Sequence, residues 1–150
     1  MNVRLSRNSD IDTLVLLDRN ANLTAWSKEN YLGSFNNKQQ NIYVLEEHGK
    51  IIGCLVVGIV LDEAEILQFW VDRNQHGKGY GHYLLTYILN ELKTRYKVIQ
   101  VFLDVRDGNN SAIKLYLKSG FIEVGRRRNY YLVDNWKFDA ITMLKRFEGC

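Results

Sequence analysis

The chain has 150 residues, of which 46% are hydrophobic and 25% charged, and this length favours a single domain, residues 1–150, around one buried core. Its formal net charge of +3 is compatible with an anionic ligand but far below that of an extended nucleic-acid surface, so no direct nucleic-acid role is expected. The two cysteines, Cys54 and Cys150, exclude a disulfide framework and a repeated metal-ligand spacing, which fits a reducing cytoplasm and no bound metal.

Nothing in the sequence points to a membrane. The N-terminus has no apolar signal core, and the longest apolar stretch, Cys54 to Leu61, is far shorter than a membrane span. Proline is absent, and no low-complexity segment or internal repeat marks a linker. We therefore expect a soluble, cytoplasmic protein that folds as one unit.

The first half of the chain predicts β-rich runs and two helices. Asp10 is expected to cap the first helix, and Ser27 to begin the second. His48 to Lys50 suits a hairpin turn between two strands. The strands predicted in this half are Val3 to Arg7, Ile42 to Glu46, Ile51 to Leu61 and Glu65 to Val71.

The second half begins with a long amphipathic helix. From Gly79 to Arg95 the apolar residues form one stripe, which predicts a helix packed on a sheet. Another helix, Asn110 to Ser119, is expected to end at Gly120. The predicted strands are Val98 to Val105, Phe121 to Val124 and Phe138 to Leu144. Because strands and helices mix without regular alternation, the expected fold class is α/β (α+β), with a mixed sheet flanked by helices.

A glycine-punctuated turn precedes the long helix. Gly77, Gly79 and Gly81 permit positive φ and close backbone approach, and the free N–H groups of a helix N-terminus favour an anion such as pyrophosphate. The turn is not a Walker A loop, because no Gly-Lys-Ser or Gly-Lys-Thr closes it, and it lacks the GxGxxG spacing of a dinucleotide site. The alternative is an ordinary flexible connection.

Two segments together carry a family resemblance. His76 to Gly81 and Asn109 to Phe121 resemble, in order and separation, the two acetyl-coenzyme A motifs of the GNAT acetyltransferase superfamily. Trp26, the run Leu103 to Arg106 and the run Arg127 to Tyr131 make the chain similar to the RimI family, which acetylates the N-terminal alanine of a small-subunit ribosomal protein. The resemblance covers nearly the whole chain and implies a single GNAT-type domain with a mostly antiparallel sheet.

Asp104 is the candidate general base. An α-amine has a pKa of about 8, so acyl transfer to it at neutral pH requires a base or a water path. Strand alternation places Asp104 with Gln100 and Phe102 on the more polar face. The resembled family has glutamate here as general base, so aspartate shortens the reach by one methylene, and a water would bridge the gap. The alternative is a strand-end carboxylate paired with Arg106 or a backbone N–H.

Tyr116 is the candidate general acid. It shares a helix face with Ala112 and Ile113, and the resemblance implies that its hydroxyl protonates the departing thiolate. The alternative is a core tyrosine. Cys54 lies among aliphatic strand residues, which favours a structural thiol over a nucleophile, so direct transfer in a ternary complex is expected.

The resemblance also implies the remaining contacts. The backbone of Phe69, Trp70 and Val71 would hold the pantetheine arm and the thioester carbonyl. Tyr130 and Tyr131 would lie in a loop over the peptide opening, with Trp26 as the opposite wall. The cofactor-binding residues expected besides the first three are His76, Gly77, Lys78, Gly79, Tyr80, Gly81, His82 and Asn109.

Other readings remain open at this point. His76 departs from the glutamine or arginine usual in the family, which leaves only a backbone contact with phosphate at that position. A GNAT enzyme acting on lysine side chains or on a small amine would share the same cofactor motifs. A non-catalytic module could instead use Arg126 to Arg128 to contact ribosomal RNA.

Overall fold

Alternating apolar residues along the chain build one seven-stranded sheet in the computed structural model, which describes residues 1–148. Cys150 therefore lies outside the described residues. The strand order is β1-β2-β3-β4-β5-β7-β6, and every neighbouring pair is antiparallel except the parallel pair β4 and β5. The strands are β1 Asn2–Leu5, β2 Gln40–Glu47, β3 Lys50–Val60, β4 Glu63–Val71, β5 Gln100–Arg106, β6 Ile122–Val133 and β7 Trp136–Arg146.

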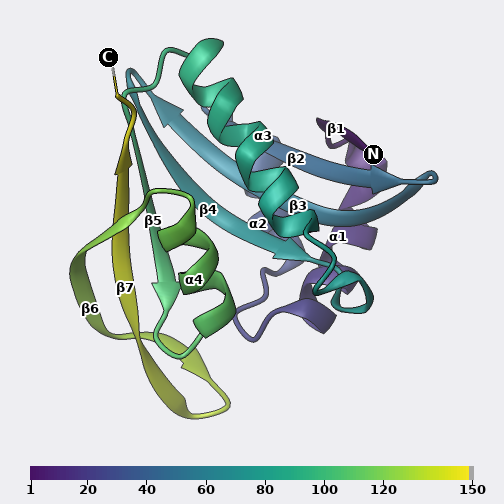
Figure 1. Ribbon diagram of the computed structural model, residues 1–150. Helices are drawn as coiled ribbons and strands as arrows, with labels where there is room; N and C mark the ends of the chain where they lie inside the picture. Colours follow the sequence, from purple (N-terminus) through teal and green to yellow (C-terminus); the bar gives the residue numbers. More distant parts are fainter. Residues whose placement is uncertain (149–150) are drawn as a thin grey trace.

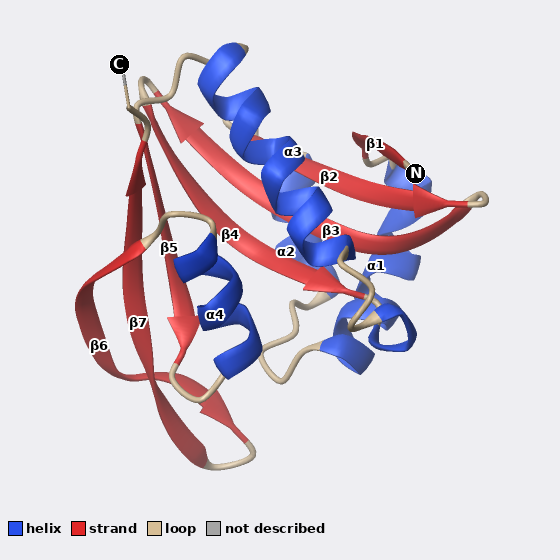
Figure 2. Cartoon of the chain, in the orientation of Figure 1, coloured by secondary structure: helices blue, strands red, loops and turns tan. Residues whose placement is uncertain are grey.

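Helices cover both faces of this sheet (Figures 1 and 2). The helices α3 and α4 lie on one face, and α1 and α2 lie on the other, over the half that contains β2 to β4. The helical segments are η1 Asn8–Asp10, α1 Ile11–Ala21, α2 Lys28–Phe35, η2 Arg73–Gln75, α3 Tyr80–Thr94 and α4 Asn110–Lys118. This arrangement confirms the predicted mixed, mostly antiparallel sheet flanked by helices.

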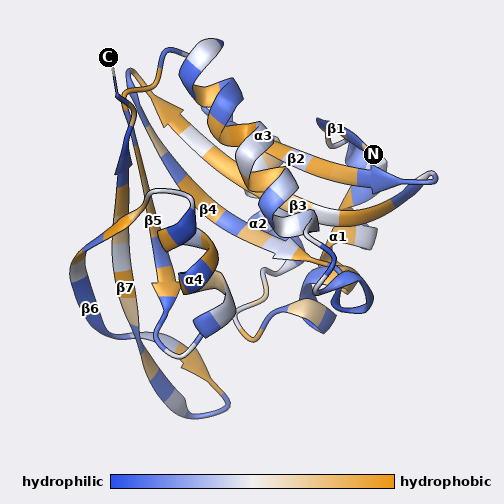
Figure 3. Ribbon diagram, in the orientation of Figure 1, coloured by the Kyte–Doolittle hydropathy of each residue, from blue (hydrophilic) through white to orange (hydrophobic). Residues whose placement is uncertain are grey.

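Two apolar clusters hold the layers together (Figure 3). The predicted stripe of α3, including Leu84, Leu85 and Ile88, is fully buried against the sheet. Tyr31 of α2 and Leu14 of α1 are equally buried in the cluster on the opposite face. Within residues 1–148, no helix is both long and apolar enough to cross a lipid bilayer.

The sheet opens between β4 and β5. Their pairing ends at Ile66 and Leu103, and beyond that point the two strands diverge (Figure 1). The register between β3 and β4 shifts where Val57 pairs with Ile66 but Val56 pairs with Gln68, so β4 carries one extra residue there. This bulge sends β4 away from β5. Residues 67–71 consequently have no strand partner on the side that faces β5.

Three local predictions were wrong. The late strands are longer than the apolar runs indicated, because β6 and β7 continue to a turn at Asp134 and Asn135, both with positive φ. The segment from Arg127 to Tyr131, expected to be a loop, is a bulged part of β6. Asp10 occupies the N-cap of α1 but makes no capping hydrogen bond, because its carboxylate binds Arg4. Ser27 caps α2 as predicted.

Candidate functional site

A cavity of about 290 Å³ lies where the end of β4, the glycine turn and the start of α4 meet. Gly77 and Gly79 have φ of 78° and 83°, a conformation that disfavours other residues. Gly79 is the N-cap of α3, and no side chain caps this helix, so its first N–H groups stay available to an anion. The predicted residues that line this cavity are Phe69, Trp70, Val71, His76, Gly77, Gly79, Tyr80, Gly81, Asn109 and Tyr116.

Lys78 and His82 are not among the residues that line this cavity. The ammonium of Lys78 donates to Oε1 of Gln75 at 3.1 Å, and His82 lies on the exposed side of α3. His76 donates from Nε2 to the carbonyl oxygen of Val71 at 2.7 Å, so its ring holds the end of β4. His76, which replaces the glutamine or arginine usual in the resembled family, therefore has a structural role at the end of β4.

A second, smaller cavity of about 90 Å³ lies on the other side of Tyr116. The loop between α1 and α2 forms one wall, and β5 with Tyr131 forms the other. Four residues line both cavities, so the two meet there: Asn22, Phe69, Asn109 and Tyr116. The other predicted residues that line the second cavity are Trp26, Asp104 and Tyr131.

Asp104 presents a hydrogen-bonded carboxylate to the second cavity. Oδ1 accepts from the hydroxyl of Thr142 at 2.6 Å, and Oδ2 lies 3.3 Å from Nε of Arg127. The ion-pair partner is therefore Arg127, and the alternative pairing with Arg106 is wrong, because the Arg106 guanidinium stacks over the ring of Phe138. Only 13% of the Asp104 side chain is exposed, so it is shielded from bulk water but open to the cavity.

A second carboxylate lies near Asp104. Burial and the negative charge of Asp104 raise the pKa of Glu65 on β4, while Arg127 opposes the shift. Arg127 is therefore the cation near both carboxylates, and its charge favours the ionised form of Glu65.

Tyr116 is buried between two aromatic rings. Its ring centroid lies 6.2 Å from that of Phe69 and 5.7 Å from that of Phe121. Burial raises the pKa of the Tyr116 phenol well above its ordinary value of 10.0, so the hydroxyl keeps its proton at neutral pH. Among residues 1–148 this hydroxyl has no hydrogen-bond partner, which leaves it free for a ligand in either cavity.

The two neighbouring tyrosines of β6 differ in position. Tyr131 lines the second cavity, and its hydroxyl donates to the carbonyl oxygen of Asp104 at 3.3 Å. Burial raises the pKa of Tyr131 to about 12. Tyr130 is 54% exposed and packs edge-on against Tyr131 outside the cavity, beneath the guanidinium of Arg127. Only Tyr131 therefore faces the space expected to hold the peptide.

The basic run on β6 is largely neutralised. Arg126 pairs with Asp107 at 2.7 Å and with Asp139 at 3.3 Å, and Arg127 pairs with Asp104. Within the described part of the chain, Arg128 alone of the three forms no ion pair, although its charge helps to lower the pKa of Asp139. This pairing weakens the hypothesis of an RNA-binding module.

Cys54 is completely buried in β3 and lines neither cavity. Burial raises the pKa of its thiol far above the ordinary value, which disfavours the reactive thiolate. These observations support the structural role predicted for Cys54.

Several residues at the site had no signal in the sequence. Thr142 and Arg127 reach Asp104 only through the register of β5, β7 and β6. Gln68, Asn22 and Thr24 line the second cavity because β4 bulges and the loop after α1 folds over it. No spacing along a single element predicts such contacts.

Residues 11–121 match the Acetyltransferase (GNAT) family, and the chain belongs to this family. Enzymes of this family use acetyl-coenzyme A, and this chain is accordingly an acetyltransferase.

Several relatives of this chain have names that specify a ribosomal protein as the substrate. The chain is 32% identical over 135 residues to the ribosomal protein bS18-alanine N-acetyltransferase of Escherichia coli K12, with 90% of each chain covered. It is 36% identical over 125 residues to the enzyme of the same name from Haemophilus influenzae, with 81% of this chain and 82% of the relative covered. The crystal structure of the ribosomal-protein-S18-alanine N-acetyltransferase from Escherichia coli superimposes with a TM-score of 0.90 at 28% identity, covering 99% of this chain and 97% of that one.

Proposed function

We propose that this acetyltransferase transfers the acetyl group of acetyl-coenzyme A to the N-terminal α-amine of a cytoplasmic protein that begins with alanine. The observation that carries the proposal is the pair of cavities that meet at Tyr116. One lies beside the N-terminus of α3, which no side chain caps, and the other lies beside Asp104. The relatives named as alanine N-acetyltransferases of a ribosomal protein support the same acceptor, the N-terminus of a small-subunit ribosomal protein.

The first cavity fits the donor. Acetyl-coenzyme A supplies the thioester and, in its pyrophosphate, the anion that the N–H groups at the start of α3 attract. The open edge of residues 67–71 offers backbone groups to the pantetheine arm. Because the carbonyl of Val71 already accepts from His76, the backbone of Phe69 is the stronger candidate for this contact.

The second cavity fits the acceptor. The carboxylate of Asp104 would take the proton of the attacking amine, directly or through one water, and Thr142 and Arg127 hold it in place. Tyr116 would donate its proton to the departing sulfur. Trp26 and Tyr131 would form the walls around the first residues of the peptide.

A panel of peptides that differ only in the first residue tests the acceptor. We expect acetylation at the N-terminus of the alanine-initiated peptide and none when its α-amine is blocked, with mass spectrometry locating the acetyl group. Equal rates for every first residue, or acetylation of internal lysines or of small amines, would contradict the proposal.

Initial-velocity kinetics test the direct transfer. We expect the intersecting pattern of a ternary complex, because the Cys54 thiol is fully buried and lines neither cavity. A ping-pong pattern would require a covalent acetyl-enzyme and would contradict this proposal.

A further inference from the structure

Asp18 of α1 is a fully buried carboxylate with no part in the proposed chemistry. No lysine or arginine pairs with it among residues 1–148. Burial raises its pKa, although the hydrogen bonds that it accepts act in the opposite direction. A buried carboxylate without a cationic partner contributes little to stability. The position of Asp18 inside the fold therefore calls for another explanation.

The carboxylate of Asp18 gathers donors from three parts of the chain. Oδ2 accepts from the backbone N–H of Trp26 at 3.1 Å, from Nε2 of Gln68 at 3.1 Å and from the hydroxyl of Tyr31. The Tyr31 hydroxyl in turn accepts from the indole of Trp70 at 2.8 Å. One carboxylate thus joins α1, the loop that follows it, α2 and β4.

The loop between α1 and α2 depends on these bonds. Residues 22–27 contain no helix or strand, yet Asn22, Thr24 and Trp26 line the second cavity. Gln68, which donates to Asp18, also donates to the carbonyl oxygen of Thr24 at 3.2 Å. The Trp26 ring packs edge-on against Tyr31, with ring centroids 5.3 Å apart. Asp18 and its donors therefore hold the wall at Thr24 and at Trp26.

We infer that Asp18 is a positioning residue, which fixes residues 22–27 as the acceptor wall and thereby sets the KM for the peptide. The inference rests on the proposed transfer to a peptide amine. Asp18 contacts neither cavity itself and acts through Trp26 and Gln68. Its loss should loosen the wall on the acceptor side more than the donor site, which consists mainly of β4, the glycine turn and α4.

The variant Asp18→Leu keeps a similar shape and removes both acceptor oxygens. We expect the KM for an alanine-initiated peptide to rise about tenfold, as for the loss of a hydrogen bond to a charged group. The Kd for acetyl-coenzyme A should stay within about twofold, because Asn22 is the one residue of the 22–27 wall that also lines the donor cavity. Amide hydrogen exchange at Trp26 should accelerate, while exchange at Val56 in β3 should not.

Two further variants sharpen the test. Asp18→Asn keeps one oxygen that can occupy the place of Oδ2, so its KM for the peptide should lie close to that of the unmodified protein. Gln68→Leu removes the tie between Asp18 and Thr24 and replaces Asp18→Leu if that variant does not fold. Because Gln68 itself lines the second cavity, the test in this variant is faster amide exchange at Trp26, and unchanged exchange there would contradict the inference.

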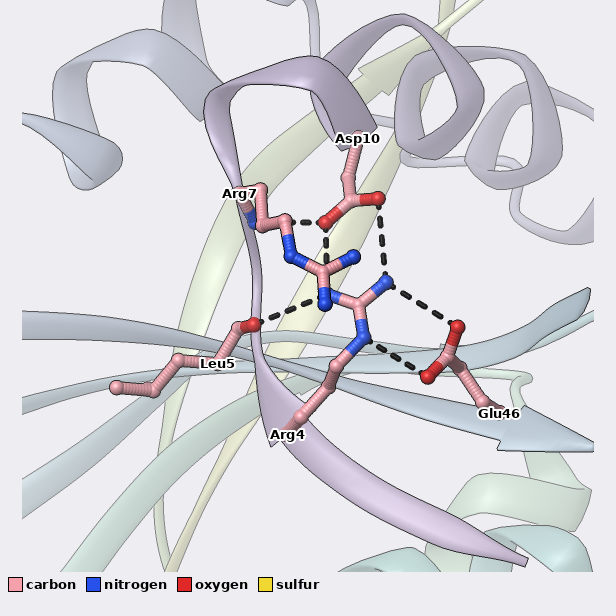
Figure 4. A network of polar contacts seen from close by, with 5 residues as sticks. All are labelled: Arg4, Leu5, Arg7, Asp10 and Glu46. Atoms are coloured by element: carbon pink, nitrogen blue, oxygen red, sulfur yellow. Dashed lines mark hydrogen bonds and ion pairs between the residues drawn. The ribbon is translucent and has the colours of Figure 1, made fainter. Parts of the chain in front are cut away.

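Glu46→Gln is the matched control. It weakens another polar network, centred on Arg4 and outside both cavities (Figure 4), and should lower stability without changing the KM. An unchanged exchange rate at Trp26, or faster exchange with an unchanged KM, would overturn the inference. So would an equal rise in the KM for the peptide and the Kd for acetyl-coenzyme A. Failure of the unmodified protein to acetylate the peptide would instead refute the proposed function, and hydrogen exchange would still test the positioning.

Discussion

At the scale of single residues, the site separates two titratable groups into unlike surroundings. Asp104 accepts a hydrogen bond from the hydroxyl of Thr142 and pairs with the guanidinium of Arg127 at the edge of the second cavity. Tyr116 has aromatic rings beside it and no protein partner for its hydroxyl, which suit a neutral acid. These unlike environments support the proposed division of roles, with Asp104 as the base and Tyr116 as the acid.

Removal of the Asp104 carboxylate should slow turnover most at low pH. Asp104→Ala should lower kcat by about 10²-fold or more, the range for loss of a general base. At high pH the amine is already neutral, so the deficit should shrink there. Thr142→Val keeps the carboxylate and loses one hydrogen bond to it, and should have a smaller effect. Turnover rates measured across pH test this prediction. An unchanged pH profile for Asp104→Ala would remove the base assignment.

Tyr116→Phe should lower kcat and leave the Kd for acetyl-coenzyme A nearly unchanged, because only the proton donor is lost. The raised pKa of Tyr116 means that the folded protein retains this proton as pH rises past the ordinary value. The kcat of the unmodified enzyme should therefore show no fall from phenol ionisation between about pH 8 and 10. Full turnover in Tyr116→Phe would refute the acid role.

At the scale of elements, the turn before α3 combines two glycines in the left-handed conformation with a helix that has no capping side chain. The first N–H groups of α3 are thereby set before any ligand arrives, so little ordering should accompany anion binding. Because Lys78 and His82 lie outside the cavity, we expect the backbone of the turn to contribute more to anion binding than these two side chains.

Gly79→Ala should weaken acetyl-coenzyme A binding and destabilise the protein by about 1 kcal/mol, because alanine disfavours a φ of 83°. Gly33→Ala is its control. Gly33 lies inside α2 with no atom near an added Cβ, and its replacement should stabilise by about 0.5 to 1 kcal/mol without affecting binding. Denaturant unfolding and calorimetry measure both effects. Equal affinities in Gly79→Ala and the unmodified protein would show that the turn does not position the anion donors.

Elements that bury one face could be predicted from the sequence. Elements that bury no face left no apolar pattern and could not be predicted. The apolar stripe of α3 located that helix to within one residue at each end. β6 is an edge strand with hardly any buried side chain. Its sequence therefore has no alternating apolar pattern that would indicate its full length. At the site, the glycine turn and the polar face of Asp104 follow from local pattern, and the base role proposed for Asp104 follows from the family resemblance. Arg127 and Thr142 reach Asp104 by strand register, which no local pattern contains.

At the scale of the whole molecule, Arg4 ties the N-terminal edge strand to two other elements (Figure 4). Its guanidinium donates to Asp10 at the start of α1 at 2.8 Å and to Glu46 of β2 at 2.8 Å. These bonds make Arg4 the link between the edge of the sheet and the helix that carries Asp18. The side chains of Arg4 and Asp10 are only 16% and 12% exposed, so solvent screens the pair weakly.

Arg4→Gln should therefore destabilise the protein at neutral pH but not in acid. The hydrogen bonds from Arg4 lower the pKa of Asp10 and of Glu46 below their ordinary values of 3.8 and 4.5. A carboxylate with a lowered folded pKa stabilises the fold above its ordinary pKa, and this contribution is lost as pH falls through the folded value. The thermal midpoint of Arg4→Gln should lie a few degrees below that of the unmodified protein at pH 7, and the two should converge as pH falls below about 4. Lys28→Gln breaks an exposed pair with Asp12 and should leave the midpoint unchanged. A difference for Arg4→Gln that persists undiminished in acid would show that Arg4 stabilises by packing rather than by charge.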